Sequence, residues 1–465
     1  MFSYMKRGRG FYREVALLSA PIVLQNLITN MLGMADTFMV GLLGEAPMAA
    51  VTLANIPVFM LHLFIFGVQS GSSVLYGQYW GKRDLESINR VLGVAVWLVL
   101  IVTSLFAAVL WFCPVQFLSL FGNEPAIIAL AAEYGRIIGL SCVFDAVVIM
   151  YITVHRSIER PDLGMYILVT SMLVNTFLNW VFIFGNLGAP MMGVAGAAFA
   201  TLIARILEVV MMAAHIMSKP KDFRVDFRLL FRPGGDMTRR FARYGLPVVC
   251  NETLWGIGTS AYTTVMGHMN GSTEILAAYT LAGNVDKICA VMSFGLGATT
   301  AIIIGREVGA GRVEKVREVG YTLATLSLIF GGCIGLLLVL FAWFVAPAVV
   351  FPLFKLSAKA SSIAIMMMVM RGLSRCVQDF NGVVITGVLR GGGDVKTATL
   401  VDLIPLWAMG IPLAVLCGIV LKLDIFWVYF IIVLEQIVKA LVGFWRMRSG
   451  KWVKDLTRPV GKEHA

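Results

Sequence analysis

A single acidic residue, Asp36, interrupts a long uncharged stretch near the start of the chain. Residues 15–35 carry no charged side chain, and the apolar run continues to Gly41. A carboxylate inside a membrane-spanning helix costs a few kcal/mol, so such residues are rare and mark ion or substrate pathways. A purely structural role would require a basic partner from another helix. The residue type and its setting therefore favour an ion site at Asp36.

The helix that carries Asp36 has two further features. A polar stripe at spacings of three to four residues is formed by Asn26, Asn30, Gly33 and Thr37. Pro21 removes a backbone hydrogen bond and predicts a bend in the same helix. A bendable helix with one polar face and one acid predicts an ion site that moves.

Three polar residues later in the chain are candidate partners of Asp36. Asn175 and Asn179 lie one helical turn apart in one predicted span, and Thr201 lies in the next. Amides and hydroxyls inside membranes more often hold helices together than bind ions. If these three converge on Asp36, however, they supply enough oxygen atoms to hold a proton or a partly hydrated Na⁺.

The second half of the chain contains less certain candidates. Glu252 lies on a polar stripe with Gly256, Thr259 and Thr263, near the middle of a predicted span. Asp379 follows Arg375 by one helical turn, so it is either a cation ligand or one half of a buried salt bridge. Secondary candidates for a functional acid are Asp145 and Asp286.

The composition indicates which class of protein carries these residues. Of 465 residues, 58% are apolar and only 14% are charged, against about 25% charged in soluble domains. The formal net charge is +11, but the basic residues lie between hydrophobic runs, which indicates membrane topology and not nucleic-acid binding. The seven cysteines are scattered singly, and we expect neither disulfides nor metal ligands. The chain is a polytopic membrane protein.

Hydropathy predicts an all-α fold with twelve membrane-spanning helices. The predicted spans cover about 14–41, 47–79, 89–113, 126–154, 162–184, 192–217, 241–268, 275–305, 317–346, 358–388, 396–421 and 424–446. Lysines and arginines concentrate before the first span and after every even-numbered one, and the alternate connections hold only Lys355, Lys359 and Lys422. This asymmetry predicts that both termini are cytoplasmic, in an inner or plasma membrane.

An internal repeat predicts how the spans are grouped. SAPIVLQN at 19–26 resembles GLPVVCNE at 245–252, with Pro21 matching Pro247. Six spans in each half make the repeats parallel, about an axis along the membrane normal. We predict an N-terminal lobe at 1–217, a basic cytoplasmic linker at 218–240, a C-terminal lobe at 241–448 and a basic tail at 449–465.

Six short motifs carry a family resemblance that covers essentially all twelve predicted spans. They are NMLGMADTFMVGLLG at 30–44, YGQYWGKRD at 76–84, NTFLNWVFIFG at 175–185, GVAGAAFAT at 193–201, IGREVGAGR at 304–312 and GVLRGGGDVKTA at 387–398. Together they resemble the multidrug and toxic compound extrusion (MATE) family, and more closely its NorM-type branch. One other branch has an aspartate where this chain has Asn179, which argues against that branch.

The resemblance implies an antiporter that exports amphipathic, usually cationic, compounds while H⁺ or Na⁺ flows inward. It implies an N-lobe cation site at Asp36, supported by Asn175, Asn179 and Thr201, and a bend point at Pro21. It also implies a C-lobe site at Glu252 and Asp379, although Arg375 replaces an uncharged ring of that branch.

A lipid-linked oligosaccharide flippase of the same architecture is the alternative, since Arg136, Arg205, Arg371 and Arg375 lie within predicted spans. No nucleotide-binding, zinc or nucleophile motif occurs, so we expect no enzyme activity, no cofactor and no metal beyond Na⁺. Expected partners are small cationic molecules and membrane lipids, without nucleic acid, and the expected oligomeric state is a monomer.

Overall fold

The computed structural model describes residues 5, 7–122, 124–218, 222–354 and 356–457. The side chains of Met34, Ala35, Thr37, Glu45 and Leu353 also lie outside the described set. Thr37 of the predicted polar stripe is therefore not described beyond its backbone. Parts of the predicted linker (219–221) and of the predicted tail (458–465) also fall outside the described residues.

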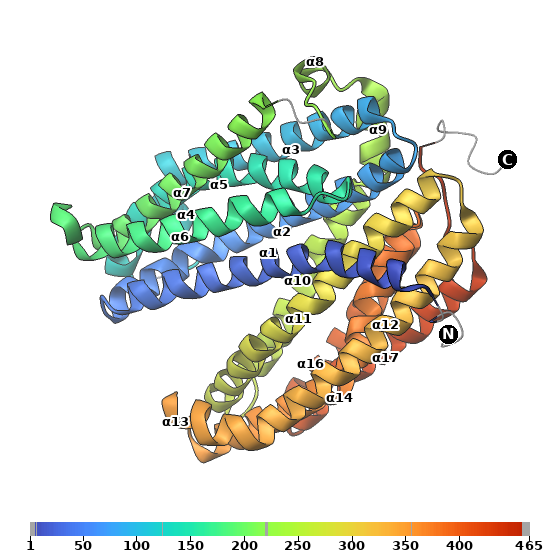
Figure 1. Ribbon diagram of the computed structural model, residues 1–465. Coiled ribbons are helices and arrows are strands. Elements are labelled where there is room, and N and C mark those ends of the chain that lie inside the picture. The colour runs from blue at the N-terminus through green and yellow to red at the C-terminus, as the bar shows by residue number, and fades with distance from the viewer. Residues whose placement is uncertain (1–4, 6, 123, 219–221, 355, 458–465) are drawn as a thin grey trace. The chain divides into compact units, whose positions relative to one another are not determined.

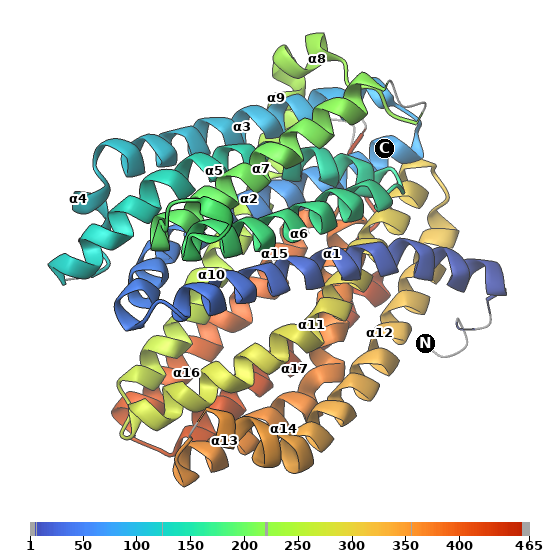
Figure 2. The same cartoon turned by 60° about the vertical axis from the view of Figure 1, so that its left-hand side comes forward.

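The first half of the chain forms a series of long helices with short connections. These elements are α1 (Arg9–Gly41), α2 (Glu45–Gly81), α3 (Leu85–Phe112), α4 (Pro114–Leu118), α5 (Pro125–Ser157), α6 (Asp162–Phe184), η2 (Asn186–Gly188), α7 (Gly193–Met217), α8 (Phe227–Phe231) and α9 (Gly235–Tyr244). Figures 1 and 2 show α2, α3, α5, α6 and α7 running side by side.

The second half has the same character but contains π-helical segments, which bear the η labels from η3 onward. Its elements are α10 (Leu246–Gly267), α11 (Ser272–Gly309), α12 (Val313–Leu340), η3 (Phe341–Val350), α13 (Phe351–Leu353), α14 (Ala358–Asn381), η4 (Gly382–Arg390), α15 (Val395–Ile404), η5 (Pro405–Gly410), α16 (Ile411–Val415), η6 (Leu416–Val420) and α17 (Ile425–Ser449). Prolines explain two of the π-helical segments, because Pro347 lies inside η3 and Pro405 begins η5.

The all-α class predicted from the sequence is confirmed. Within the described residues the only β-type pairing is an isolated bridge between Gly393 and Val453. Among the described residues, eleven helical segments are long and apolar enough to cross a membrane. The predicted seventh span, α10, is not among them, because Asn251, Glu252 and several threonines lower its hydropathy. With α10 counted, the segments in the described part of the chain that correspond to predicted spans number twelve.

The chain folds into two compact units. The C-terminal unit contains residues 250–465 together with residues 1–23, and the N-terminal unit contains residues 24–249. Helix α1 therefore passes from one unit to the other between Val23 and Leu24, and α10 does so between Val249 and Cys250.

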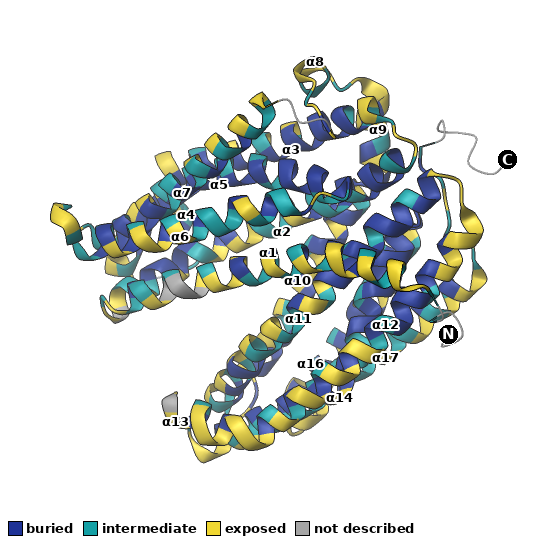
Figure 3. Cartoon of the chain, viewed as in Figure 1, coloured by how far each residue is buried: buried dark blue, intermediate teal, exposed yellow. Residues whose placement is uncertain are grey.

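Small residues allow close helix packing within both units. In the N-terminal unit, a Cβ at Gly196 of α7 would lie 2.6 Å from the Phe182 carbonyl oxygen of α6. In the C-terminal unit, a Cβ at Gly335 of α12 would lie 2.2 Å from the Gly372 carbonyl oxygen of α14. Glycine is common where membrane helices approach this closely. Figure 3 shows buried residues on the facing sides of such helices and exposed residues on their outer sides.

Candidate functional site

Asp36 lies in the last third of α1, where α6 faces it. The Nδ2 atom of Asn179 donates to Asp36 Oδ1 over 2.5 Å. Asn179 is fully buried, so this amide is fixed by its surroundings. In the described part of the chain, the carboxylate is held by amide donors and not by a basic side chain.

Asn175, one turn before Asn179, joins Asp36 to α7. In the amide orientation that satisfies its neighbours, Asn175 donates to Asp36 Oδ1 over 3.0 Å. Its oxygen then accepts from the Thr201 backbone nitrogen at 3.3 Å and from Thr201 Oγ1 at 3.2 Å. In the opposite orientation, the Asn175 oxygen accepts from Asn179 Nδ2 at 3.2 Å and its nitrogen donates to Thr201.

The two orientations of Asn175 suit two states of Asp36. An ionised carboxylate accepts only, so it favours the orientation in which the amide nitrogen faces it. A protonated carboxyl carries a donor, and a bound cation attracts oxygen, so both favour an amide oxygen on that side. The structure thus brings together the four residues predicted as an N-lobe cluster, Asp36, Asn175, Asn179 and Thr201, with polar atoms suited to hold a proton or Na⁺.

A second charged cluster lies in the same unit, centred on Arg205 of α7. Its Nη1 atom contacts Asp145 Oδ1 of α5 at 3.0 Å and both carboxylate oxygens of Glu208, at 2.8 and 3.0 Å. His62 Nε2 of α2 lies 3.2 Å from Asp145 Oδ2. Asp145 thus contacts both Arg205 and His62, while Arg136, an arginine of the same helix α5, is exposed.

In the C-terminal unit, Glu252 belongs to a network of buried charges. Arg390 Nη1 lies 2.5 Å from Glu252 Oε1, and both side chains are largely buried. The network continues through Asp402, which lies 3.8 Å from Arg390 and 3.0 Å from Lys439. Lys439 in turn contacts Glu435 at 2.8 Å. Sequence spacing gave no sign of the pairs that Arg390 forms with Glu252 and Asp402, or Asp402 with Lys439, because these residues come from α10, η4, α15 and α17. Glu435 and Lys439, by contrast, lie one turn apart on α17.

Asp379 forms the ion pair that its spacing from Arg375 allows. Arg375 Nη2 lies 2.8 Å from Asp379 Oδ1, and each side chain is 3% exposed. Arg375 Nη1 also contacts Asp286 Oδ1 at 2.9 Å, and Arg371 pairs with the other oxygen of Asp286. Both acids of this cluster therefore have arginine partners within the C-terminal unit.

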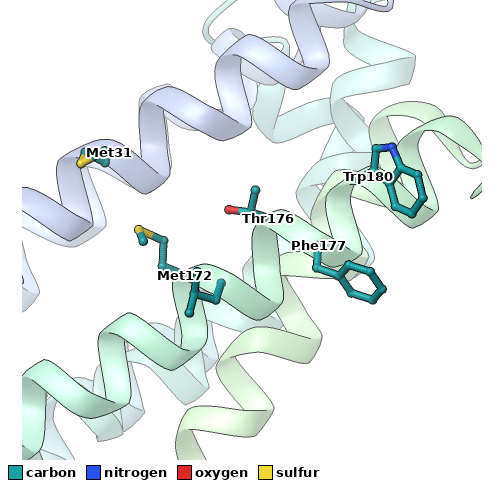
Figure 4. A pocket seen from close by; sticks show the side chains of 6 residues that line it. Met31, Met172, Thr176, Phe177 and Trp180 are labelled. Atoms are coloured by element: carbon teal, nitrogen blue, oxygen red, sulfur yellow. The ribbon is translucent and has the colours of Figure 1, made fainter.

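A cavity of about 490 Å³ opens between α1 and α6 in the N-terminal unit. It is lined by Met31, Met172, Leu173, Thr176, Phe177 and Trp180. Figure 4 shows Met31 on α1 and the other labelled side chains on α6. Their positions fall on a face of α6 next to the one that carries Asn175 and Asn179. Thioethers and aromatic rings adapt to apolar molecules of varied shape.

Comparison with known proteins identifies relatives along most of the chain. The MatE family model matches residues 21–181 and 247–416. The protein named "Probable multidrug resistance protein NorM" from Mesorhizobium japonicum is 29% identical over 411 residues, which cover 87% of this chain and 86% of that protein.

Two solved structures share the fold. One is described as the outward-facing conformation of a multidrug resistance MATE family transporter of the MOP superfamily. It superposes with a TM-score of 0.83 at 22% identity, over 94% of this chain and 96% of that one. The other is a MOP superfamily transporter from Pyrococcus furiosus, described as having a binding pocket of reverse polarity. It has a TM-score of 0.82 at 22% identity, over 94% and 95% of the two chains.

Proposed function

The chain belongs to the MatE family of membrane transporters, and we propose that it is an antiporter that exports amphipathic organic cations in exchange for inward H⁺ or Na⁺. Relatives named as multidrug resistance proteins support the choice of substrate class. The proposed coupling site is the cluster of Asp36 with Asn175, Asn179 and Thr201.

The observation that carries this proposal is the kind of partner that Asp36 has. Its carboxylate receives hydrogen bonds from neutral amides, so its negative charge is not cancelled by a protein cation. The other candidate acids, Asp145, Glu252, Asp286 and Asp379, all contact arginine. A buried charge without a cationic partner attracts an external one, whereas a paired charge has little net attraction.

Exchange follows if the coupling ion and the substrate both depend on Asp36. Binding H⁺ or Na⁺ from outside removes the negative charge that attracts a cationic substrate, and the substrate leaves outward. Release of the ion inward restores the charge for the next substrate. Because coupling between two ligands is reciprocal, the substrate also weakens ion binding.

The change between inward and outward access requires a helix that can bend. We propose Pro21 as that hinge, because it lies inside α1 two residues before the chain passes from one compact unit to the other. The same proposal places both termini on the cytoplasmic side, from the distribution of basic residues between spans.

The flippase alternative lacks support from the charges of the described residues. That function calls for a strongly basic cavity, but three of the four arginines that favoured it form ion pairs with acidic side chains. Arg205 contacts Asp145 and Glu208, while Arg371 and Arg375 contact Asp286.

Efflux measured in bacteria that lack their own drug exporters tests the proposal. Cells expressing the wild type should expel an organic cation such as ethidium, and Asp36→Asn should not, at equal amounts in the membrane. Glu133→Gln, which removes an exposed acid of α5, is the matched control and should export normally. Imposing a Na⁺ or a pH gradient separately identifies the coupling ion. Equal export by Asp36→Asn and wild type would contradict the proposal.

A further inference from the structure

His62 has two contacts that one neutral imidazole cannot satisfy. Its Nδ1 atom lies 2.9 Å from the Val58 carbonyl oxygen, and its Nε2 atom lies 3.2 Å from Asp145 Oδ2. A carbonyl oxygen only accepts hydrogen bonds, and so does an ionised carboxylate. Both ring nitrogens must therefore carry a hydrogen for both contacts to be hydrogen bonds, which makes His62 an imidazolium.

The charges around His62 lead to the same conclusion. The groups that surround it come from helices packed against α2, namely Asp145 and the neighbouring Cys142 thiol of α5, and Arg205 with Glu208 of α7. When both are ionised, Asp145 and Glu208 contribute two negative charges, and Arg205 contributes one positive charge. With neutral His62 the cluster keeps one uncompensated negative charge away from water, which is unfavourable. One proton on His62 makes it neutral overall.

Exposure sets His62 apart from the acids of the cluster. The side chain of His62 is 41% exposed, that of Asp145 is 7% exposed and that of Glu208 is 1% exposed. His62 is therefore the accessible member of a row of charged side chains in which Asp145 and Glu208 are buried.

We propose that His62, with Asp145, Arg205 and Glu208, forms a second proton-binding site in the N-terminal unit. The imidazolium of His62 holds the proton and releases it to water, becoming neutral imidazole. This site is distinct from the Asp36 cluster, and only its consequence for transport rests on the proposed function.

Helix α7 links the two sites. Thr201 of the Asp36 cluster and Arg205 of the His62 site lie one turn apart on it. Loss of the His62 proton makes this region more negative, so Asp36 should bind H⁺ or Na⁺ more tightly. By reciprocity, a cation on Asp36 should make His62 release its proton more readily.

The protonation state of His62 can be measured directly in the whole protein. Histidine side chains labelled with ¹⁵N are observed by NMR in lipid nanodiscs, and His62→Gln, or His62→Asn if the first variant fails to fold, assigns the signal among the five histidines. At about pH 7.5, where imidazole in water is mostly neutral, both His62 nitrogens should be protonated. In Asp145→Asn, the His62 signals should change to those of a neutral tautomer.

His155 and His215 serve as internal controls, because they contact Tyr151 instead. Their signals should be the same in Asp145→Asn as in the wild type. A single protonated nitrogen on His62 at about pH 7.5 in the wild type would overturn the second site. That result is independent of transport, so it is distinguishable from normal export by Asp36→Asn, which would overturn the proposed function.

The link between the sites needs a second measurement. The cation affinity of Asp36 should be about 5-fold or more higher in His62→Gln, which lacks the charge, than in His62→Lys, which keeps it. Equal affinities in these two variants would show that the sites are independent.

Discussion

Pro21 and Pro247 occupy equivalent positions, each two residues before its helix passes from one compact unit to the other. Their helical settings nevertheless differ. Pro21 lies well inside the continuous helix α1, whereas Pro247 lies in the first turn of α10, directly after α9 and Gly245. A proline in a helix interior removes a backbone hydrogen bond, while one in the first turn removes none. Of the two equivalent prolines, only Pro21 weakens its helix.

Replacing these prolines should therefore have unequal effects. Pro21→Ala restores a hydrogen bond in α1, and proline is about 3 kcal/mol less favourable than alanine in a helix interior. We expect this variant to be at least as stable as the wild type and to export more slowly. Pro247→Ala, its matched control, should change the export rate little. Export measured in proteoliposomes at equal protein content checks this prediction, and equal slowing by both variants would contradict it.

The amide of Asn179 should determine how tightly Asp36 holds its cation. Asn179→Ala removes the donor 2.5 Å from Asp36, and hydrogen bonds to charged groups contribute about 1.5–3 kcal/mol. We expect the affinity for the coupling ion to change by about 10- to 100-fold. Asn186→Ala is the control, because this partly exposed amide just after α6 donates to the Trp180 carbonyl oxygen. Calorimetric titration with Na⁺ and with acid measures the ion affinity of each variant. Similar affinities in Asn179→Ala and Asn186→Ala would refute the role of Asn179.

The pair of Glu252 and Arg390 should matter for stability. Glu252→Gln leaves the buried Arg390 without its nearest carboxylate, and breaking such a pair costs about 3–5 kcal/mol. The double variant Glu252→Gln with Arg390→Met should recover much of the lost stability. In that variant both charges of the pair are removed, so neither is left buried without the other. Glu274→Gln should have an effect below about 1 kcal/mol, since its pair with Lys359 at 4.0 Å is partly exposed. Thermal unfolding in detergent ranks the wild type and the three variants by stability. A double variant less stable than Glu252→Gln would refute the argument.

Two glycines of α12 provide a matched test of helix packing. A Cβ at Gly335 would meet the backbone of α14, whereas nothing lies within 4 Å of a Cβ at Gly332. Gly335→Ala should therefore force α12 and α14 apart and lower the unfolding temperature. Gly332→Ala should keep or raise it, because alanine favours a helix by about 1 kcal/mol over glycine. Equal unfolding temperatures of the two variants would show that α12 and α14 can separate at Gly335 with little loss of stability.

The sequence by itself determined the membrane class, the all-α fold, the family and the candidate acids. These depend on local properties: uninterrupted apolar runs, helical spacing and short motifs. The spacing of Arg375 and Asp379, one turn apart on one helix, also indicated an ion pair as the alternative to a cation site at Asp379.

Only the tertiary structure decided which acids have cationic partners. Arg390 reaches Glu252 across 138 positions of sequence, and Asp145 meets both His62 and Arg205 from other helices. Such pairs depend on which helix faces meet and at what depth, and the hydropathy of a span is nearly the same for every rotation about its axis. The sequence therefore identified Asp36 as a charge inside the membrane, and the packing of α6 against α1 left it with amide donors in place of a basic partner.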